Sequence, residues 1–309
     1  MENYSAISEF VLLGLSSDPY IQAILFVLFL LIYLLTLMGN SLMLLVIRAD
    51  SPLHTPMYFF LRQLSFLDLC HSSVTTPKIL ENVLSESKTI SVESCLVQAF
   101  FVFATGGTEA CLLAVMAYDR YVAISSPLLY GQVMSNQLCV GLVWGSWGLG
   151  FVDALINILM AVNLDFCKAQ TIVHFSCELS SLFPLSCSDT SLNFTLLICS
   201  SVLHSFGTFI IILSSYACIV STILSISSTS SRSKAFSTCS SHLICVSLFY
   251  GSGFISYLLP RSGSPLEMIF SLQYSVIVPM LNPLIYSLKN KEVKAEMGRM
   301  FRKYFHPLT

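Results

Sequence analysis

Seven long apolar stretches constrain this chain more than any other feature of its sequence. Each holds the roughly 20 residues that a helix needs to cross about 30 Å of hydrocarbon. The second stretch is the least apolar, because Arg62, Asp68 and His71 interrupt it. We count it because omitting it would leave both chain ends on one side of the membrane, against the distribution of charge. The stretches are residues 23–47, 57–80, 94–124, 138–162, 192–226, 235–260 and 266–288.

The composition agrees with lipid as the main solvent of the chain. Charged residues make up 10% and hydrophobic residues 55% of the 309 residues, whereas soluble domains carry about 25% charged residues. The net charge of −2 is too small to favour nucleic acid as a partner. The sequence therefore predicts an all-α membrane protein with one seven-transmembrane helix bundle and no separate soluble domain.

Basic residues indicate how the bundle is oriented, because Lys and Arg accumulate in short cytoplasmic loops. They gather on one side if the amino terminus is outside. Residues 1–22 are then expected to form an extracellular tail, with Asn3 as a glycosylation acceptor. A signal peptide is the alternative for this end, but residues 1–20 contain acidic residues and no Lys or Arg, the reverse of a signal peptide. Residues 23–288 form the expected bundle.

The segment 289–309 follows the last apolar stretch and reads "KNKEVKAEMGRMFRKYFHPLT". Its apolar residues fall on one helical face and its basic residues on the rest, which predicts a short amphipathic eighth helix along the inner leaflet. A solvated basic tail is the alternative.

Four of the 11 cysteines lie outside the membrane in this orientation, and an oxidising compartment favours disulfides. They are Cys95, Cys167, Cys177 and Cys187. The sequence therefore predicts two disulfides, and four cysteines can be paired in three ways. Metal binding by these cysteines is the alternative, but no CxxC pair supports it. The other seven are expected to be free thiols.

Asp68, Glu109 and Asp153 are the acidic residues to weigh inside predicted spans, where an ionisable group needs a partner within the bundle. Asp68 and Glu109 lie at similar depth, and we expect either a hydrogen-bonded cluster with one carboxyl protonated or a bound monovalent cation such as Na⁺. Asp153 is expected to mark where the fourth span meets water. The chain shows neither HExxH nor GxSxG, so an enzyme is not predicted, and no cofactor other than structural Na⁺ is expected. A transporter or channel with Asp68 and Glu109 as a cation relay is the alternative function.

Six motifs in order along the chain resemble those of olfactory receptors, which are rhodopsin-like (class A) G-protein-coupled receptors. The three loop cysteines follow one another at intervals of ten residues, which also resembles that family. The motifs are "GN" at 39–40, "PMYFFLRQLSFLDLC" at 56–70, "MAYDRYVAI" at 116–124, "SY" at 215–216, "KAFSTCSSHL" at 234–243 and "PMLNPLIYSLKN" at 279–290.

The resemblance implies an odorant receptor in the plasma membrane of olfactory sensory neuron cilia. It implies that an odorant activates a stimulatory olfactory-type G protein and raises cyclic AMP. In that family the arginine at the Arg120 position is held by its neighbouring acid until the sixth span swings outward. The implied switch residues are Asp119, Arg120, Tyr121, Tyr216, Asn282, Pro283 and Tyr286.

The same resemblance implies that Cys95 pairs with Cys177 and Cys167 with Cys187. It also places a small-molecule cavity between the third, fifth, sixth and seventh spans. No acid is among its expected lining residues, which argues against amine ligands. These residues are Val102, Phe103, Gly106, Gly107, Ser200, Ser201, His204, Tyr250, Gly253, Phe254, Tyr257, Leu272 and Ser275.

Three positions depart from the family pattern. Ser125 and Leu129 stand where a cysteine and a basic residue are usual, and Arg62 stands where a small polar residue is common. Ser125 and Leu129 fall in the second inner loop, so they bear on coupling strength more than on fold.

Overall fold

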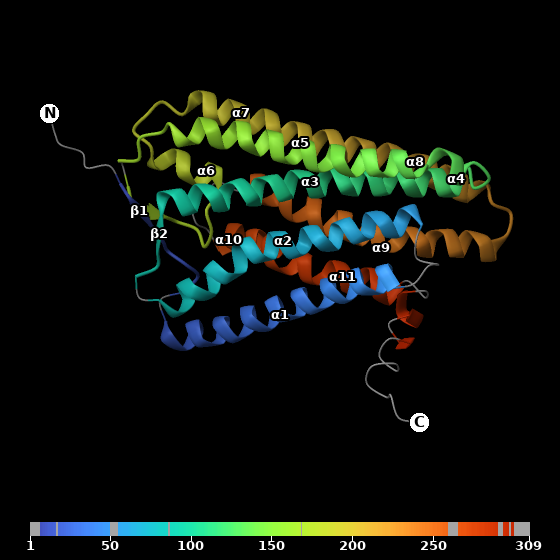
Figure 1. Cartoon of the computed structure of the whole chain (residues 1–309), viewed down its shortest axis with the longest axis horizontal. Coiled ribbons are helices and arrows are strands. Elements are labelled where there is room, and N and C mark those ends of the chain that lie inside the picture. Colours follow the sequence, from blue (N-terminus) through green and yellow to red (C-terminus); the bar gives the residue numbers. More distant parts are fainter. Residues whose placement is uncertain are drawn as a thin grey trace.

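The computed structural model describes residues 7–16, 18–49, 55–85, 87–167, 169–258, 265–289, 293–296 and 298–299. Within these residues, seven long helical segments run side by side along the long axis of the molecule (Figure 1). They coincide in order and position with the seven predicted spans. The segments are α1 (Pro19–Ala49), α2 (Pro56–Leu84), α3 (Val92–Ser125), α5 (Asn136–Val162), α7–η3–α8 (Ser191–Ser201, Val202–Gly207, Thr208–Ser225), α9 (Thr229–Leu258) and α10–η4–α11 (Pro265–Leu272, Gln273–Ile277, Val278–Lys289).

Five of these segments, among the described residues, are long and apolar enough to count as membrane spans by composition, and α2 and α9 are not. In α2 the cause is that its polar side chains face the bundle, where Asp68 and His71 are buried, while Phe66 is 49% exposed. In α9 the first turns carry a polar sequence that begins at Thr229. The mean hydropathy of such a helix understates its suitability as a membrane span, because its polar side chains are buried inside the bundle and do not contact lipid.

The helix starts follow local sequence signals. The Ser91 hydroxyl caps α3 by accepting from the backbone N–H of Ser94 at 3.2 Å, and Ser135 caps α5 in the same way through Leu138. Pro56 occupies the first position of α2, where its missing N–H costs nothing. These caps fix where the loops end.

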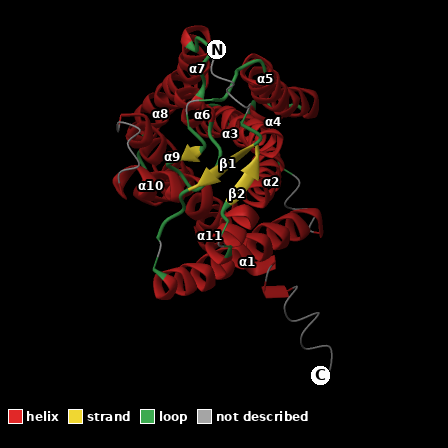
Figure 2. Ribbon diagram, turned by 90° about the vertical axis from the view of Figure 1, so that its left-hand side faces the viewer, coloured by secondary structure: helices red, strands yellow, loops and turns green. Residues whose placement is uncertain are grey.

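A three-stranded sheet covers one end of the bundle, called here the sheet end (Figure 2). Strand β1 (Glu9–Leu12) lies in the middle, antiparallel to β2 (Thr89–Ser91) and parallel to β3 (Thr171–Ile172). Residues 9–12 were expected to belong to a tail, and the sequence analysis did not anticipate the sheet. Phe10 of β1 is fully buried and packs edge-on against Phe166 at 5.2 Å.

Three short helical turns complete the described chain. The turn α4 (Tyr130–Val133) follows α3 and marks the opposite end of the bundle, called here the α4 end. The turns α6 (Leu179–Leu182) and η2 (Phe183–Leu185) lie in the long loop at the sheet end. After α11, residues 293–296 are helical and Val293 is buried; the chain beyond residue 299 lies outside the described residues.

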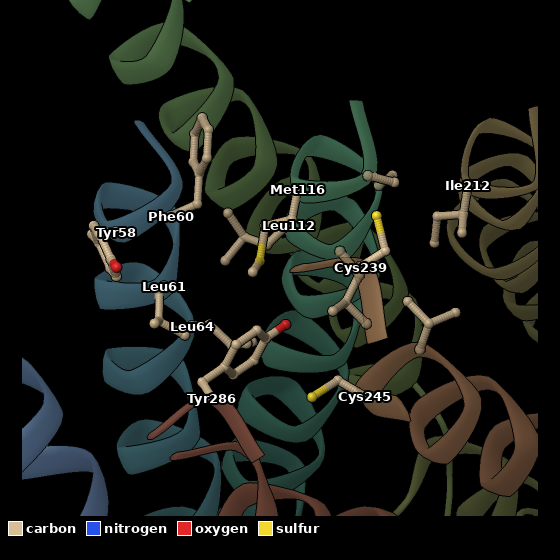
Figure 3. Close-up of a cluster of buried hydrophobic side chains, with 14 of the residues drawn as sticks. Tyr58, Phe60, Leu61, Leu64, Leu112, Met116, Ile212, Cys239, Cys245 and Tyr286 are labelled. Atoms are coloured by element: carbon tan, nitrogen blue, oxygen red, sulfur yellow. The ribbon is translucent and has the colours of Figure 1, made fainter. Parts of the chain in front are cut away.

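The largest apolar core occupies the half of the bundle toward the α4 end (Figure 3). Tyr286 of α11 lies in this core between Leu64 of α2 and Cys245 of α9. A second core at the sheet end joins β1, β3 and the long loop to α3. The two cores hold the ends of the bundle and leave room between them for a cavity.

Candidate functional site: a mid-bundle cavity and a polar link at the α4 end

A cavity of about 780 Å³ lies between α3, α7, η3, α9 and α10. This volume falls in the usual range for small-molecule sites. Most of its lining is apolar, from α3, α7 and α9. The predicted residues that line it are Val102, Phe103, Gly106, Gly107, Ser200, Ser201, His204, Tyr250 and Gly253.

Four other residues predicted to line the cavity are not found in its lining. Leu272 and Ser275 do not line the cavity; Leu272 packs instead with the apolar cluster of Phe29 and Ile79, and Ser271 and Tyr274 take their places in the lining. The prediction was one residue out of phase, and one residue turns a helix by about 100°. The side chains of Phe254 and Tyr257 lie outside the described residues.

The long loop contributes a wall that the sequence analysis missed. Glu178, Leu179 and Ser180 line the cavity, and the Ser271 hydroxyl donates to Oε1 of Glu178 at 3.2 Å. This corrects the expectation that the lining has no acid. The signal was available, since Glu178 directly follows Cys177, which a disulfide holds against α3.

A polar cluster joins α5 to the segment α7–η3, and two of its members, Ser200 and His204, line the cavity. The Ser200 hydroxyl donates to Oδ1 of Asp153 at 2.7 Å, and Asn157 Nδ2 donates to Ser200 at 2.9 Å. Nε2 of His204 lies 3.0 Å from Oδ2 of Asp153. Asp153 was expected to mark the contact of the fourth span with water. That expectation was wrong, because its carboxylate faces the bundle and has partners there.

The π-helical turn η3 explains why His204 reaches this wall. In η3 the His204 carbonyl oxygen accepts from the Thr208 hydroxyl, and the Thr208 and Tyr250 hydroxyls lie 2.6 Å apart. A π-helical turn adds a residue to the helix and often marks a functional site. Here the turn holds His204 on the inner side of the bundle, and Thr208, directly after the turn, contacts α9 through Tyr250.

Near the α4 end, an imidazole links three helices. Nδ1 of His242 in α9 lies 2.8 Å from the Tyr216 hydroxyl of α8, and Nε2 lies 3.0 Å from the Leu113 carbonyl oxygen of α3. His242 is fully buried. The sequence analysis placed His242 inside a motif without giving it a role, and its burial beside a tyrosine was not visible in the sequence.

Asp119 and Arg120 lie one to two turns deeper toward the α4 end, and both are buried. The Tyr130 hydroxyl of α4 donates to Oδ1 of Asp119 at 2.8 Å. Burial and the adjacent carboxylate raise the pKa of Tyr130, so its phenol remains a donor at neutral pH. Asp119 is therefore shared between the arginine beside it and the loop turn α4. Tyr121 is partly buried and packs against the core.

Comparisons with known proteins agree with this arrangement. A family model described as "Olfactory receptor" matches residues 29–304. The chain belongs to the olfactory receptor family. It is 67% identical over 294 residues to "Olfactory receptor 8S1" of Homo sapiens, covering 95% of this chain and 82% of that protein. It is 47% identical over 305 residues to "Olfactory receptor 5AP2" of Mus musculus, covering 98% and 96%.

As a member of this family, the protein is a multi-pass membrane protein of the class A G-protein-coupled receptors. These receptors have a seven-helix bundle. The protein is an odorant receptor. The human relative "Olfactory receptor 5F1" is 45% identical over 304 residues and covers 98% of this chain and 97% of its own length, so the likeness extends over both the cavity and the α4 end.

The receptor has two disulfides at the sheet end. Cys95 at the start of α3 is joined to Cys177, with 5.4 Å between their Cα atoms, and Cys167 is joined to Cys187 at 5.8 Å. These are the pairs that the resemblance implied. Gln98 Oε1 accepts from the backbone N–H of Cys177 at 2.8 Å, which adds a second tie between the loop and α3.

Two acidic side chains of the receptor, Asp68 and Glu109, are buried within the bundle. Asn282 Nδ2 of α11 donates to both oxygens of Asp68 at 3.2 and 3.1 Å, and Glu109 is buried on α3. Asn40 Nδ2 donates to the Pro279 carbonyl oxygen at 2.9 Å. Oδ1 of Asn282 and Oδ1 of Asn40 are buried without a hydrogen bond. Among the described residues no group of three or more His, Cys, Asp or Glu side chains is arranged around one point.

Proposed function

We propose that an odorant in the cavity shifts the receptor toward a form that activates a stimulatory olfactory-type G protein and raises cyclic AMP. The observation that supports this most is the position of Tyr250 and His242 on α9. Tyr250 lines the cavity, and His242, eight residues and about 12 Å along the same helix, makes the link to α3 and α8. A ligand that moves α9 at Tyr250 therefore acts on that link.

Arg120 is the proposed contact for the G protein. Arg120 is buried on α3, seven residues and about 10 Å along the helix from Leu113, whose carbonyl oxygen takes part in the three-helix link. An outward movement of α9 opens the site around it. A guanidinium suits this role because it stays charged and can exchange partners without losing a proton. Asp119, Tyr121, Pro283 and Tyr286 complete the proposed switch with Tyr216 and Asn282.

The sidedness follows from charge and is also a proposal. The amino terminus and sheet end face outside, and the α4 end faces the cytoplasm of a ciliary plasma membrane. Asn3, in the tail 1–22, is the proposed glycosylation site and lies outside the described residues. A second acceptor sequence at Asn193 is excluded by burial, since Asn193 is 4% exposed in α7. Residues 289–309 form the proposed cytoplasmic amphipathic helix.

Asp68 and Glu109 are the residues that would hold Na⁺. The donor set suits a monovalent cation, because Asp68 and Glu109 are both buried, Asn282 contacts Asp68, and Oδ1 of Asn282 has no hydrogen bond. Bound Na⁺ would neutralise one carboxylate and hold α2, α3 and α11 together. Catalysis or cofactor chemistry has no part in this proposal.

A cyclic AMP reporter screen against an odorant panel tests the function. Any odorant that activates the wild-type receptor should give no signal with Arg120→Ala, while binding to the purified variant is retained. An equal signal in the variant would refute the coupling role of Arg120. For the rival transporter or channel, sustained ion flux through the purified receptor in liposomes would be needed. Family membership favours the receptor.

A ligand shifts the balance only by its difference in affinity for the two forms. Strong binding alone is therefore not enough, and the screen should record both binding and signal.

A further inference from the structure

His204 presents its two ring nitrogens to different surroundings. Nε2 lies 3.0 Å from Oδ2 of Asp153, away from the open cavity. Nδ1 faces α3, 3.7 Å from Sγ of Cys111, and a Cβ atom built on Gly107 would come within 3.4 Å of it. The ring therefore packs closely against the α3 backbone at Gly107. Gly107 and His204 both line the cavity, so this is the side from which a polar group of a ligand would reach the ring.

Asp153 decides which nitrogen carries the proton. Its Oδ1 is held by the hydroxyl of Ser200 at 2.7 Å and by Nδ2 of Asn157 at 3.4 Å. Its Oδ2 is left to the imidazole. The N–H of Nε2 does not point straight at this oxygen, and neither atom makes an aligned hydrogen bond. The contact is nevertheless too close for two bare acceptors, so Nε2 bears a proton, and a ring with one proton then has its lone pair at Nδ1.

The lone pair at Nδ1 has only a weak partner in this structure among the described residues. A thiol is a poor hydrogen-bond donor, and 3.7 Å from Cys111 is a long contact. A hydroxyl is a much better donor of similar size. A ligand hydroxyl placed beside Gly107 would therefore replace the thiol contact by a stronger hydrogen bond.

We propose that this cavity selects odorants that carry a hydroxyl group, which donates to Nδ1 of His204 while the apolar remainder packs against Val102 and Phe103. The inference rests on the proposed ligand-activated function of the same cavity. Ethers and ketones lack the donor. Carboxylates are disfavoured because they have no proton to donate to Nδ1.

Three probes of equal heavy-atom number test the ligand class: n-decanol, methyl nonyl ether and methyl octyl ketone. The readouts are cyclic AMP in cells and ligand-induced thermal stabilisation of the purified receptor. We expect n-decanol to act at a roughly tenfold lower concentration than the other two, the change typical of one buried hydrogen bond. Equal potency of the alcohol and the ether refutes the proposal. Decylamine as the strongest ligand also refutes it and points to Glu178 instead.

Asp153→Asn gives the sharpest test of the positioning role. An asparagine would keep its carbonyl oxygen where Ser200 and Asn157 donate, and would turn its NH₂ group toward Nε2 of His204. The ring proton would then move to Nδ1, which becomes a donor. The variant should therefore prefer methyl octyl ketone to n-decanol, a reversal that a purely structural role for Asp153 does not produce. An unchanged preference for the alcohol in a folded variant refutes the positioning role.

Two further variants address His204 directly. His204→Phe keeps a ring but removes the acceptor, so the advantage of n-decanol over the ether should disappear. Cys111→Ala removes the competing thiol and should make n-decanol more potent; no gain would count against the proposed hydroxyl position. Ser214→Ala is the matched control, because Ser214 lies outside the cavity lining on an exposed part of α8, where its hydroxyl donates to the Ile210 carbonyl oxygen. It should leave the alcohol-to-ether ratio unchanged.

The two hypotheses fail differently. If odorants outside this series activate the receptor through Arg120 and the hydroxyl gives no advantage, the ligand class is wrong and the receptor function stands. If n-decanol stabilises the purified receptor selectively but no odorant raises cyclic AMP, the hydroxyl site stands and the proposed coupling is wrong.

Discussion

The imidazole of His242 lies between the Tyr216 hydroxyl and the backbone of α3, with Nδ1 2.8 Å from the hydroxyl and Nε2 3.0 Å from the Leu113 carbonyl oxygen. Its ring is nearly parallel to that of Tyr216. A buried side chain that contacts two neighbouring helices stabilises one arrangement of those helices. Its contacts are lost when the helices separate.

His242→Phe should therefore raise the ligand-independent cyclic AMP signal. The phenyl ring fills similar space but cannot reach the Leu113 carbonyl oxygen with a hydrogen bond, and one such bond is worth about 1 kcal/mol, or about fivefold in the balance of states. The measurement is basal signal at matched surface expression. Tyr216→Phe is the control, since it leaves the α3 contact and should raise the basal signal less. A basal signal equal to wild type would contradict the role of this link.

The close approach of α3 and α5 makes a stability prediction. A Cβ atom at Gly150 would lie 2.6 Å from the Ala104 carbonyl oxygen, which is backbone and cannot turn aside. Gly150→Ala should lower the stability by about 1–3 kcal/mol and the melting temperature of the purified receptor. Gly148→Ala is the control on the same helix, where nothing lies within 4 Å, and it should be neutral or stabilising. Equal melting temperatures for the two variants would contradict this packing.

Loss of the disulfide between Cys95 and Cys177 should weaken both fold and ligand response. Removing a native disulfide costs about 2–5 kcal/mol in small domains, and here Glu178 would also lose its fixed place in the cavity wall. Cys95→Ser should reduce surface expression and the response of whatever receptor reaches the membrane. Cys199→Ser changes an exposed free thiol and should leave both unchanged. An odorant response in Cys95→Ser equal to wild type at matched expression would show that the loop wall does not depend on this bond.

Sodium should stabilise the receptor through the buried carboxylates. A ligand at ten times its Kd stabilises the form that binds it by about 1.4 kcal/mol, so the melting temperature should be higher in NaCl than in choline chloride at equal ionic strength. Asp68→Asn should abolish the difference in melting temperature between NaCl and choline chloride, because an amide replaces the carboxylate that would bind the cation. A sodium effect of the same size in this variant would place the cation elsewhere.

The bundle was predictable because a membrane allows few solutions. Continuous apolar stretches fix the number and order of the helices, and the buried Asp68 and His71 explain why α2 still belongs among them. The cavity followed in large part, since most of its lining comes from helices whose motifs matched a known family. The misplacement of Leu272 by one residue shows the limit of that approach. A local π-helical turn changes which side chains face inward without leaving a signal in the sequence pattern.

What the sequence did not indicate comes from contacts between distant segments. The strand around Phe10 has an ordinary apolar pattern, and only pairing with residues 89–91 and 171–172 makes it the centre of a sheet. Asp153 looked like a helix end because its partner His204 stands 51 positions later, on another helix. Pairings of this kind depend on the three-dimensional approach of helices, which periodicity and composition do not encode.

The turns η3 and η4 each hold an extra residue, yet helix continues directly on both sides of each turn without a break. Deleting a single codon within either turn would let it relax to ordinary α-helical geometry. Only the side chains of that turn would change direction, while the helix ends and the residues of the proposed switch would keep their positions. Insertion and deletion at these two turns thus offer receptors of this kind an evolutionary route to new chemical preferences, separate from point substitution.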